Sequence, residues 1–285
     1  MQMPQIKLSP LGPPLRAYLS IFRMKAAEGL QYRIAALAGA SISLFWIAME
    51  ILVYSVFYLH GEHPSAGLLA GLSLRQVITY VWLAQFLFTM QPMNTDSEIL
   101  SRIQSGDVAL ELCRPLKLYH HWFAKVAAGR LIPLLGRGSV LLAVGLLVPR
   151  SYGLGLPASL PGFLCFLLST FSAFLLCSAY GTLVCSIRLS IRWGNGPVYM
   201  IMLAAGFLSG SYLPLQLWPE PLQPYLLFQP FAGYLDIPVR FYLGSLPPER
   251  ILWALGLQIF WSFLFVLMGK AVMKRKINRL IIQGG

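Results

Sequence analysis

The sequence predicts an all-α integral membrane protein, and three observations support that fold class. Of 285 residues, 57% are hydrophobic and only 11% are charged, where a soluble domain has about a quarter charged residues. Apolar runs near the length of about 20 residues that crosses a bilayer recur along the chain. The 22 Lys and Arg residues lie mainly at the ends of these runs, so the net charge of +12 predicts orientation in a membrane and no nucleic-acid partner. We expect one transmembrane domain, residues 1–285, surrounded by membrane lipids.

The N-terminal segment 12–33 is predicted to form an amphipathic helix in the membrane interface before the first span. Apolar residues recur there at the i, i+3, i+4, i+7 spacing of a helix face, and basic residues line a neighbouring face. The apolar positions are Leu15, Tyr18, Leu19, Phe22 and Ala26. The alternative is a surface helix packed on a soluble domain, but the sequence offers no such domain.

Six apolar segments are predicted to span the membrane. They are about 34–59, 74–90, 131–148, 163–187, 198–213 and 251–268. Six spans place both termini on one side. Most Lys and Arg residues fall in the N-terminal segment, in the segments after the second and fourth spans, and in the C-terminal tail. The positive-inside rule therefore predicts that both termini are cytoplasmic.

The segment 211–248, between the fifth and sixth spans, is not an ordinary loop. It has eight prolines yet remains rich in Leu, Phe, Tyr and Trp. Irregular backbone at membrane depth needs protein or a water-filled cavity to satisfy its polar groups. We expect short re-entrant helices on the outer side, and an extracellular cap of hydrophobic turns is the alternative.

The most polar stretch between spans is 99–116, which follows the second span. Ile99, Leu100 and Ile103 form an apolar stripe at helical spacing, Gly106-Asp107 interrupts the helix, and Arg114-Pro115 ends the segment. A short helix at the cytoplasmic membrane surface suits a membrane protein on which another protein acts. The alternative is an amphipathic loop helix that has no partner.

Catalytic, cofactor and metal motifs are not recognisable in the sequence. The pair Gly269-Lys270 is followed by Ala271, whereas a phosphate-binding loop needs Ser or Thr there and an earlier glycine-rich turn. The four cysteines have neither a CxxC spacing nor a Cys/His metal spacing. We therefore expect this chain not to be an enzyme and to hold no cofactor of its own.

Two charged residues fall well inside predicted spans, Glu50 in the first and Arg137 in the third. A charge at the bilayer centre costs on the order of 2.5 to 3.5 kcal/mol on insertion scales. Because the two residues have similar expected depths, we hypothesise that they pair or face one polar cavity. The alternative is that Arg137 extends its side chain to the cytoplasmic interface.

The order of these segments, together with four sequence blocks, resembles the ABC-2-type permeases, the membrane subunits of ATP-driven exporters. The resemblance covers nearly the whole chain and is strongest to the subgroup of paired permeases that accompany a drug- or antibiotic-export ATPase. The blocks are 71–82, 103–119, 208–223 and 229–244. The most specific is the Gly-Asp turn followed by Leu-x-Arg-Pro-Leu in 103–119.

This resemblance implies the role of each part. The segment 99–116 would contain the coupling helix that docks on a separate cytoplasmic ATPase. The residues implied in that contact are Ile99, Ile103, Gly106, Asp107, Leu110, Arg114 and Pro115. The long cytoplasmic loop of importer permeases is missing, so export of an amphipathic or hydrophobic substrate (a drug, antibiotic, peptide or lipid-like molecule) is expected.

The resemblance also implies the partners and the location of the protein. Two copies of the ATPase would bind ATP and Mg, and a second permease protomer, more readily a different chain than an identical one, would complete the pore in a bacterial plasma membrane. A secondary transporter acting without an ATPase is the alternative, although the halves of the chain show no clear internal repeat. An intramembrane enzyme would need a nucleophile or metal constellation that the spans do not offer.

Overall fold

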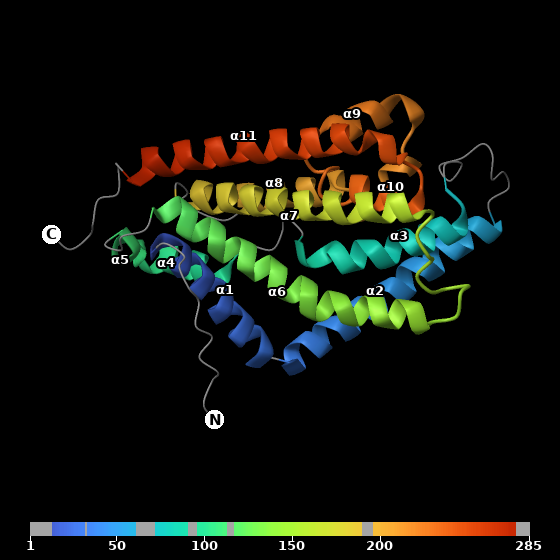
Figure 1. Ribbon diagram of the computed structural model, residues 1–285, viewed down its shortest axis with the longest axis horizontal. Helices are drawn as coiled ribbons and strands as arrows, with labels where there is room; N and C mark the ends of the chain where they lie inside the picture. The colour runs from blue at the N-terminus through green and yellow to red at the C-terminus, as the bar shows by residue number, and fades with distance from the viewer. Residues whose placement is uncertain are drawn as a thin grey trace.

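The computed structural model is all-helical and describes residues 13–31, 33–60, 72–90, 96–112, 117–189 and 196–277. Long helices run side by side along the molecule, with short helices at both ends (Figure 1). Four helices in the described ranges are long and apolar enough to cross a membrane. These are α2 (Arg33–His60), α6 (Leu118–Leu147), α7 (Leu160–Arg188) and α11 (Ile251–Ile277).

Two further helices of the bundle are shorter. Helix α3 (Leu74–Leu87) continues into a 3₁₀ turn, η1 (Phe88–Met90), and α8 (Gly196–Leu208) is apolar but has only 13 residues. Helix α8 therefore ends before the expected boundary at 213, because Gly210 adopts a left-handed φ of 87° and turns the chain. The helix that contains the expected span 131–148 is longer than expected at its N-terminal end, since α6 already begins at Leu118.

Helix α1 (Pro13–Gln31) precedes α2 and meets it at a sharp bend (Figure 1). Its buried residue Ile21 packs with Ala124 and Ala128 of α6. Leu19, which the apolar stripe in the sequence includes, is 37% exposed. The face of α1 that contacts protein is thus rotated slightly from the face that the sequence pattern indicates.

Helix α6 connects the two ends of the bundle. Its first half packs on α1, and its second half packs on α3, where Gly145 allows Trp82 to approach so closely that a Cβ at position 145 would lie 2.9 Å from the indole ring. Pro133 lies inside the helix between these two contacts. Proline removes one internal hydrogen bond at that point.

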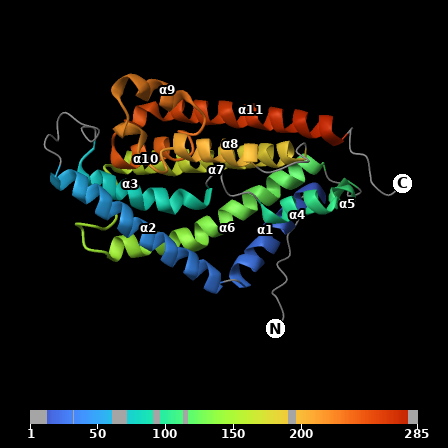
Figure 2. The ribbon, with the colours of Figure 1, turned by 180° about the vertical axis from the view of Figure 1, so that it is seen from behind.

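The segment after α8 folds into short pieces at the end of the bundle opposite α4 and α5 (Figure 2). These pieces are η2 (Leu215–Leu217), η3 (Glu220–Leu222), α9 (Gln223–Phe228), α10 (Asp236–Leu243) and η4 (Pro248–Arg250). Every residue of α10 is buried, whereas Tyr225 of α9 is 77% exposed. The prolines break the segment as expected, and its second half is a packed part of the protein instead of a solvated loop.

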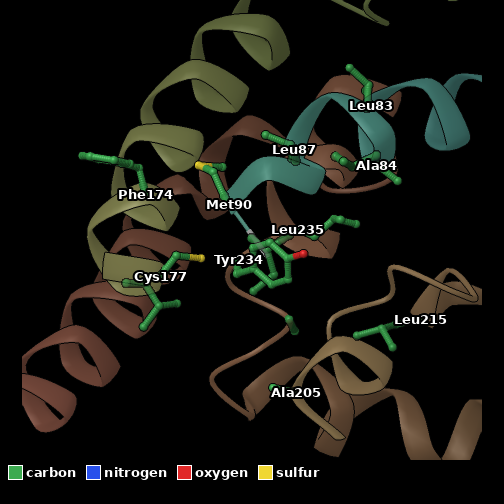
Figure 3. Packing of buried hydrophobic residues seen from close by; sticks show 14 of the residues in the cluster. Leu83, Ala84, Leu87, Met90, Phe174, Cys177, Ala205, Leu215, Tyr234 and Leu235 are labelled. Carbon is green, nitrogen blue, oxygen red and sulfur yellow. The ribbon is translucent and has the colours of Figure 1, made fainter. Parts of the chain in front are cut away.

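The main core lies where this segment meets the long helices. Figure 3 shows Tyr234 and Leu235 of the segment near Met90 and residues of α3 and α7, and Leu215 belongs to the same core further from Met90. All of the labelled core residues are buried. Close packing of this kind helps to hold an apolar segment that cannot form one continuous helix.

Candidate functional site

The polar stretch after α3 forms two short helices joined by a turn, which we call the elbow (residues 96–112). Helix α4 (Ser97–Ser105) begins at Asp96, whose Oδ1 accepts hydrogen bonds from the backbone N–H of Glu98 (2.9 Å) and Ile99 (3.2 Å). It ends at Gly106, which has φ 80°, and α5 (Val108–Leu112) follows. A left-handed residue at this point favours glycine and sets the angle between the two helices.

One side of the elbow is buried against the bundle. Ile99 is fully buried and Val108 is 2% exposed. They pack with Leu118, Trp122 and Met273. Ile99, which the sequence implicates in a contact with a partner, therefore anchors the elbow to α6 and α11 and offers no surface of its own.

Glu98 of α4 lies at the centre of a first group of ion pairs. Its Oε1 is 2.8 Å from Nζ of Lys125 in α6 and 2.8 Å from Nη2 of Arg102. Its Oε2 is 3.6 Å from Nζ of Lys25 in α1. One carboxylate thus connects three helices.

Glu111 of α5 forms a second group beside the first. Its Oε1 accepts a hydrogen bond from Arg102 at 2.8 Å, and its Oε2 accepts one from the indole N–H of Trp122 at 2.6 Å. Lys125 Nζ lies 3.5 Å from the same carboxylate, whose side chain is only 1% exposed. We call Lys25, Glu98, Arg102, Glu111, Trp122 and Lys125 together the ion network.

The ion network shifts the pKa values of its two partly exposed members, Glu98 and Lys25. Burial alone would raise the pKa of Glu98, but the hydrogen bond from Lys125 and the charges of Lys125, Lys25 and Arg102 outweigh it and lower the pKa to about 2. Burial alone would lower the pKa of Lys25, but its hydrogen bond with Glu28 and the nearby acids raise it. Both groups are therefore charged at neutral pH.

The other side of the elbow is exposed. Leu110 is 67% exposed, Gly106 and Asp107 lie on the surface, and Asp107 Oδ2 accepts a hydrogen bond from the Ser105 hydroxyl at 2.7 Å. Ile103 is partly buried. Arg114 and Pro115 lie outside the described residues. The elbow thus combines an exposed apolar and polar tip with a rigidly held base, an arrangement that suits the docking of a partner protein.

The sequence pattern did not identify the ion network. Glu98 and Arg102 have the i, i+4 spacing of a helical ion pair, which was a usable signal. Lys125 and Trp122 were placed before the third span, and only the early start of α6 brings them to the elbow. Glu111 could not be assigned from helical spacing, because its partners Arg102 and Trp122 are nine and eleven residues away in the sequence.

Glu50 and Arg137 are not brought into a direct ion pair. Glu50 Oε1 accepts a hydrogen bond from Gln85 Nε2 of α3 at 3.4 Å, while the Arg137 guanidinium lies 5.2 Å from the centre of the Phe88 ring. The Arg137 side chain lies beside Gly39, and a Cβ added at Gly39 would be 3.5 Å from Arg137 Cδ. Gly39 and Glu50 are separated along α2 by about 16 Å at 1.5 Å per residue. The two charges are therefore at different levels of the bundle.

A buried polar cluster fastens α10 to the bundle at the other end. Asp236 is fully buried. Its carboxylate accepts hydrogen bonds from the Tyr80 hydroxyl (3.2 Å), the backbone N–H of Leu215 (3.1 Å) and Arg240. This cluster joins α3, α10 and the chain that leaves α8.

A groove with a volume of about 550 Å³ lies between α2 and the end of α6. Its lining is mostly apolar and includes Ile47, Ile51, Trp82, Val144 and Val148. Such a groove can hold a hydrocarbon chain. In the described ranges, no group of three or more His, Cys, Asp or Glu side chains is placed to hold a metal ion.

A family model described as ABC-2 family transporter protein matches residues 44–284. No curated protein and no solved structure matches the chain.

Proposed function

Because the chain belongs to the ABC-2 family of transporter membrane proteins, we propose that it is the permease subunit of an ATP-driven exporter. Membrane components of this family have no catalytic site themselves and imply a partner ATPase. ATP and Mg would bind to two copies of that separate cytoplasmic ATPase. This chain would supply the substrate path and the surface on which the ATPase acts.

The observation that supports this proposal most directly is the construction of the elbow. Its tip, with Leu110 and Asp107, is exposed, and its base is held by Ile99 and the ion network. A force applied to such a tip is transmitted to α6 and α1 instead of bending a loose loop. We assign the ATPase contact to the exposed tip and the transmission of movement to the buried base.

The same proposal includes six spans with the elbow in the cytoplasm. Helices α3 and α8 would complete the count beside the four long apolar helices. The basic residues Lys274, Arg275 and Lys276 in the last turn of α11 would then lie on the same cytoplasmic side as the elbow. The segment with α9 and α10 would be at the outer surface.

The substrate would cross between this protomer and a second permease protomer, which the sequence resemblance suggests is a different chain. Exposed aromatic residues near the outer end support an amphipathic or hydrophobic cargo. These are Tyr212 (51% exposed), Tyr225 (77%) and Phe228 (59%). Aromatic residues also anchor proteins at a membrane interface.

The test is co-purification of the tagged chain from its native membranes in a mild detergent, followed by mass spectrometry. We expect a phosphate-loop ATPase to be recovered with the wild-type chain and to be reduced at least tenfold by Leu110→Asp. Ser151→Asp is the matched control, because Ser151 is also exposed but lies beyond the other end of α6. A chain that purifies alone and still transports would favour the secondary transporter instead.

A further inference from the structure

Glu50 is an intramembrane acid to which the described chain supplies no cation. Its only hydrogen bond in the described residues is the long one from Gln85 Nε2, at 3.4 Å. No Lys or Arg in the described ranges lies within 4.0 Å of its carboxylate, and Arg137 lies about three helical turns away at the level of Gly39. The side chain is partly exposed on the surface of α2.

Two exposed aromatic residues lie on the same side of α2 as this carboxylate, about one turn before it and two turns after it. Trp46 is four residues before Glu50 and is 54% exposed, and Phe57 is seven residues after it and is 61% exposed. Residues at these spacings lie on one side of a helix. Tyr54, four residues after Glu50, donates a hydrogen bond to the backbone oxygen of Tyr212. Rings of this kind attract cations over their faces.

We propose that Glu50 and the neighbouring rings of Trp46 and Phe57 bind the cationic group of the transported substrate, a lipophilic organic cation. A negative charge at this depth is stabilised by a cation from outside the chain, and an apolar ring frame suits a weakly hydrated organic cation. A metal cation is a poor fit, since Ca²⁺ or Mg²⁺ needs about six oxygen ligands. The inference names a substrate class and therefore rests on the proposed export function.

The experiment uses the full chain in phosphatidylcholine nanodiscs and two probes of the same shape and opposite charge, tetraphenylphosphonium and tetraphenylborate. Binding above that of empty nanodiscs is measured by equilibrium dialysis. We expect the wild-type chain to bind the cation and not the anion. Glu50→Gln should weaken binding of the cation at least tenfold, and Glu50→Asp should retain most of it.

Glu220→Gln is the matched control, because it removes the same charge from an exposed position in η3, and it should bind the cation as the wild type does. Equal binding of the cation by Glu50→Gln and the wild type would overturn the proposal, as would equal loss of both probes. If Glu50→Gln does not yield folded protein, the Trp46→Leu variant is measured in its place. We expect it to bind the cation severalfold more weakly than the wild type, and an unchanged affinity would overturn the proposal.

This test is independent of the ATPase, because it measures binding by the permease without ATP. A chain that binds the cation but never co-purifies with an ATPase would contradict the exporter assignment and leave the cation site intact. A chain that co-purifies with an ATPase but does not discriminate between the two probes would contradict the cation site alone.

Discussion

Glu111 is the most deeply buried acid of the ion network, and replacing it should lower the stability of the folded protein. Glu111→Gln removes the negative charge that faces Arg102 and Lys125. We expect a decrease of about 1–3 kcal/mol in the free energy of unfolding, because a buried, charge-assisted contact is lost and Arg102 and Lys125 then share the carboxylate of Glu98. Thermal unfolding in detergent measures it. Asp107→Asn, at an exposed position, should change stability by no more than about 0.5 kcal/mol, and equal shifts in the two variants would contradict the prediction.

Glu98 should make the elbow sensitive to acid. Its pKa is lowered from 4.5 to about 2 in the folded protein. A lowered pKa stabilises the folded state fully above the ordinary value, and this stabilisation is lost as the pH falls towards 2. The difference in unfolding midpoint between the wild type and Glu98→Gln should therefore be constant from pH 7 to about 5 and shrink below that. A difference that grows on acidification would exclude this role for Glu98.

Individual residues also show how much of the site could be predicted from the sequence. The position of the elbow followed from the polar stretch, and the turn followed from Gly106. Ile99 and Leu110 are both apolar residues of the same stretch, yet the first is fully buried and the second is 67% exposed. This difference depends on how α4 and α5 pack on α6 and α11, which short-range periodicity does not contain.

Gly106 determines the geometry of the elbow as an element. Gly106→Ala meets no neighbouring atom within 4 Å, but φ 80° is unfavourable for any residue with a Cβ, by roughly 1–2 kcal/mol. We expect the angle between α4 and α5 to change and the yield of co-purified ATPase to decrease.

Gly136→Ala provides the control, because a Cβ at Gly136 would also meet no neighbouring atom within 4 Å but Gly136 lies within helix α6. Alanine there should be neutral or stabilising by roughly 0.5–1 kcal/mol. Equal recovery of the ATPase with both variants would show that the left-handed turn is unnecessary for docking.

The boundaries of helices show where sequence patterns fail. The expected start of the third span, residue 131, was set by the charges that precede it. Helix α6 nevertheless begins at Leu118, because Lys125 is neutralised by Glu98 and Glu111 and can lie in a packed helix. The apolar composition after Leu208 likewise predicted a continuing span, whereas Gly210 ends α8 and Pro214 keeps the chain irregular.

For the whole molecule, the proposed six-span topology makes a direct prediction about sidedness. Single cysteines at Ser65 and Ser151, introduced in a cysteine-free background, should react with a membrane-impermeant maleimide in intact cells. A cysteine at Ser105, in the elbow, should react only after the membrane is opened. The pair Ser65 and Ser105 tests whether the short helix α3 crosses the membrane, since equal labelling of these two positions would exclude it.

Pro133 gives α6 a property that a continuous helix would lack. Lys125 lies in the ion network on one side of it, and Val144 lines the apolar groove on the other, about 28 Å further along the helix axis at 1.5 Å per residue. Because proline weakens the helix at one point, the two halves of α6 can change their mutual angle while each keeps its own packing. A displacement at the elbow can thus become a change in the width of a distant apolar groove through a single hinge.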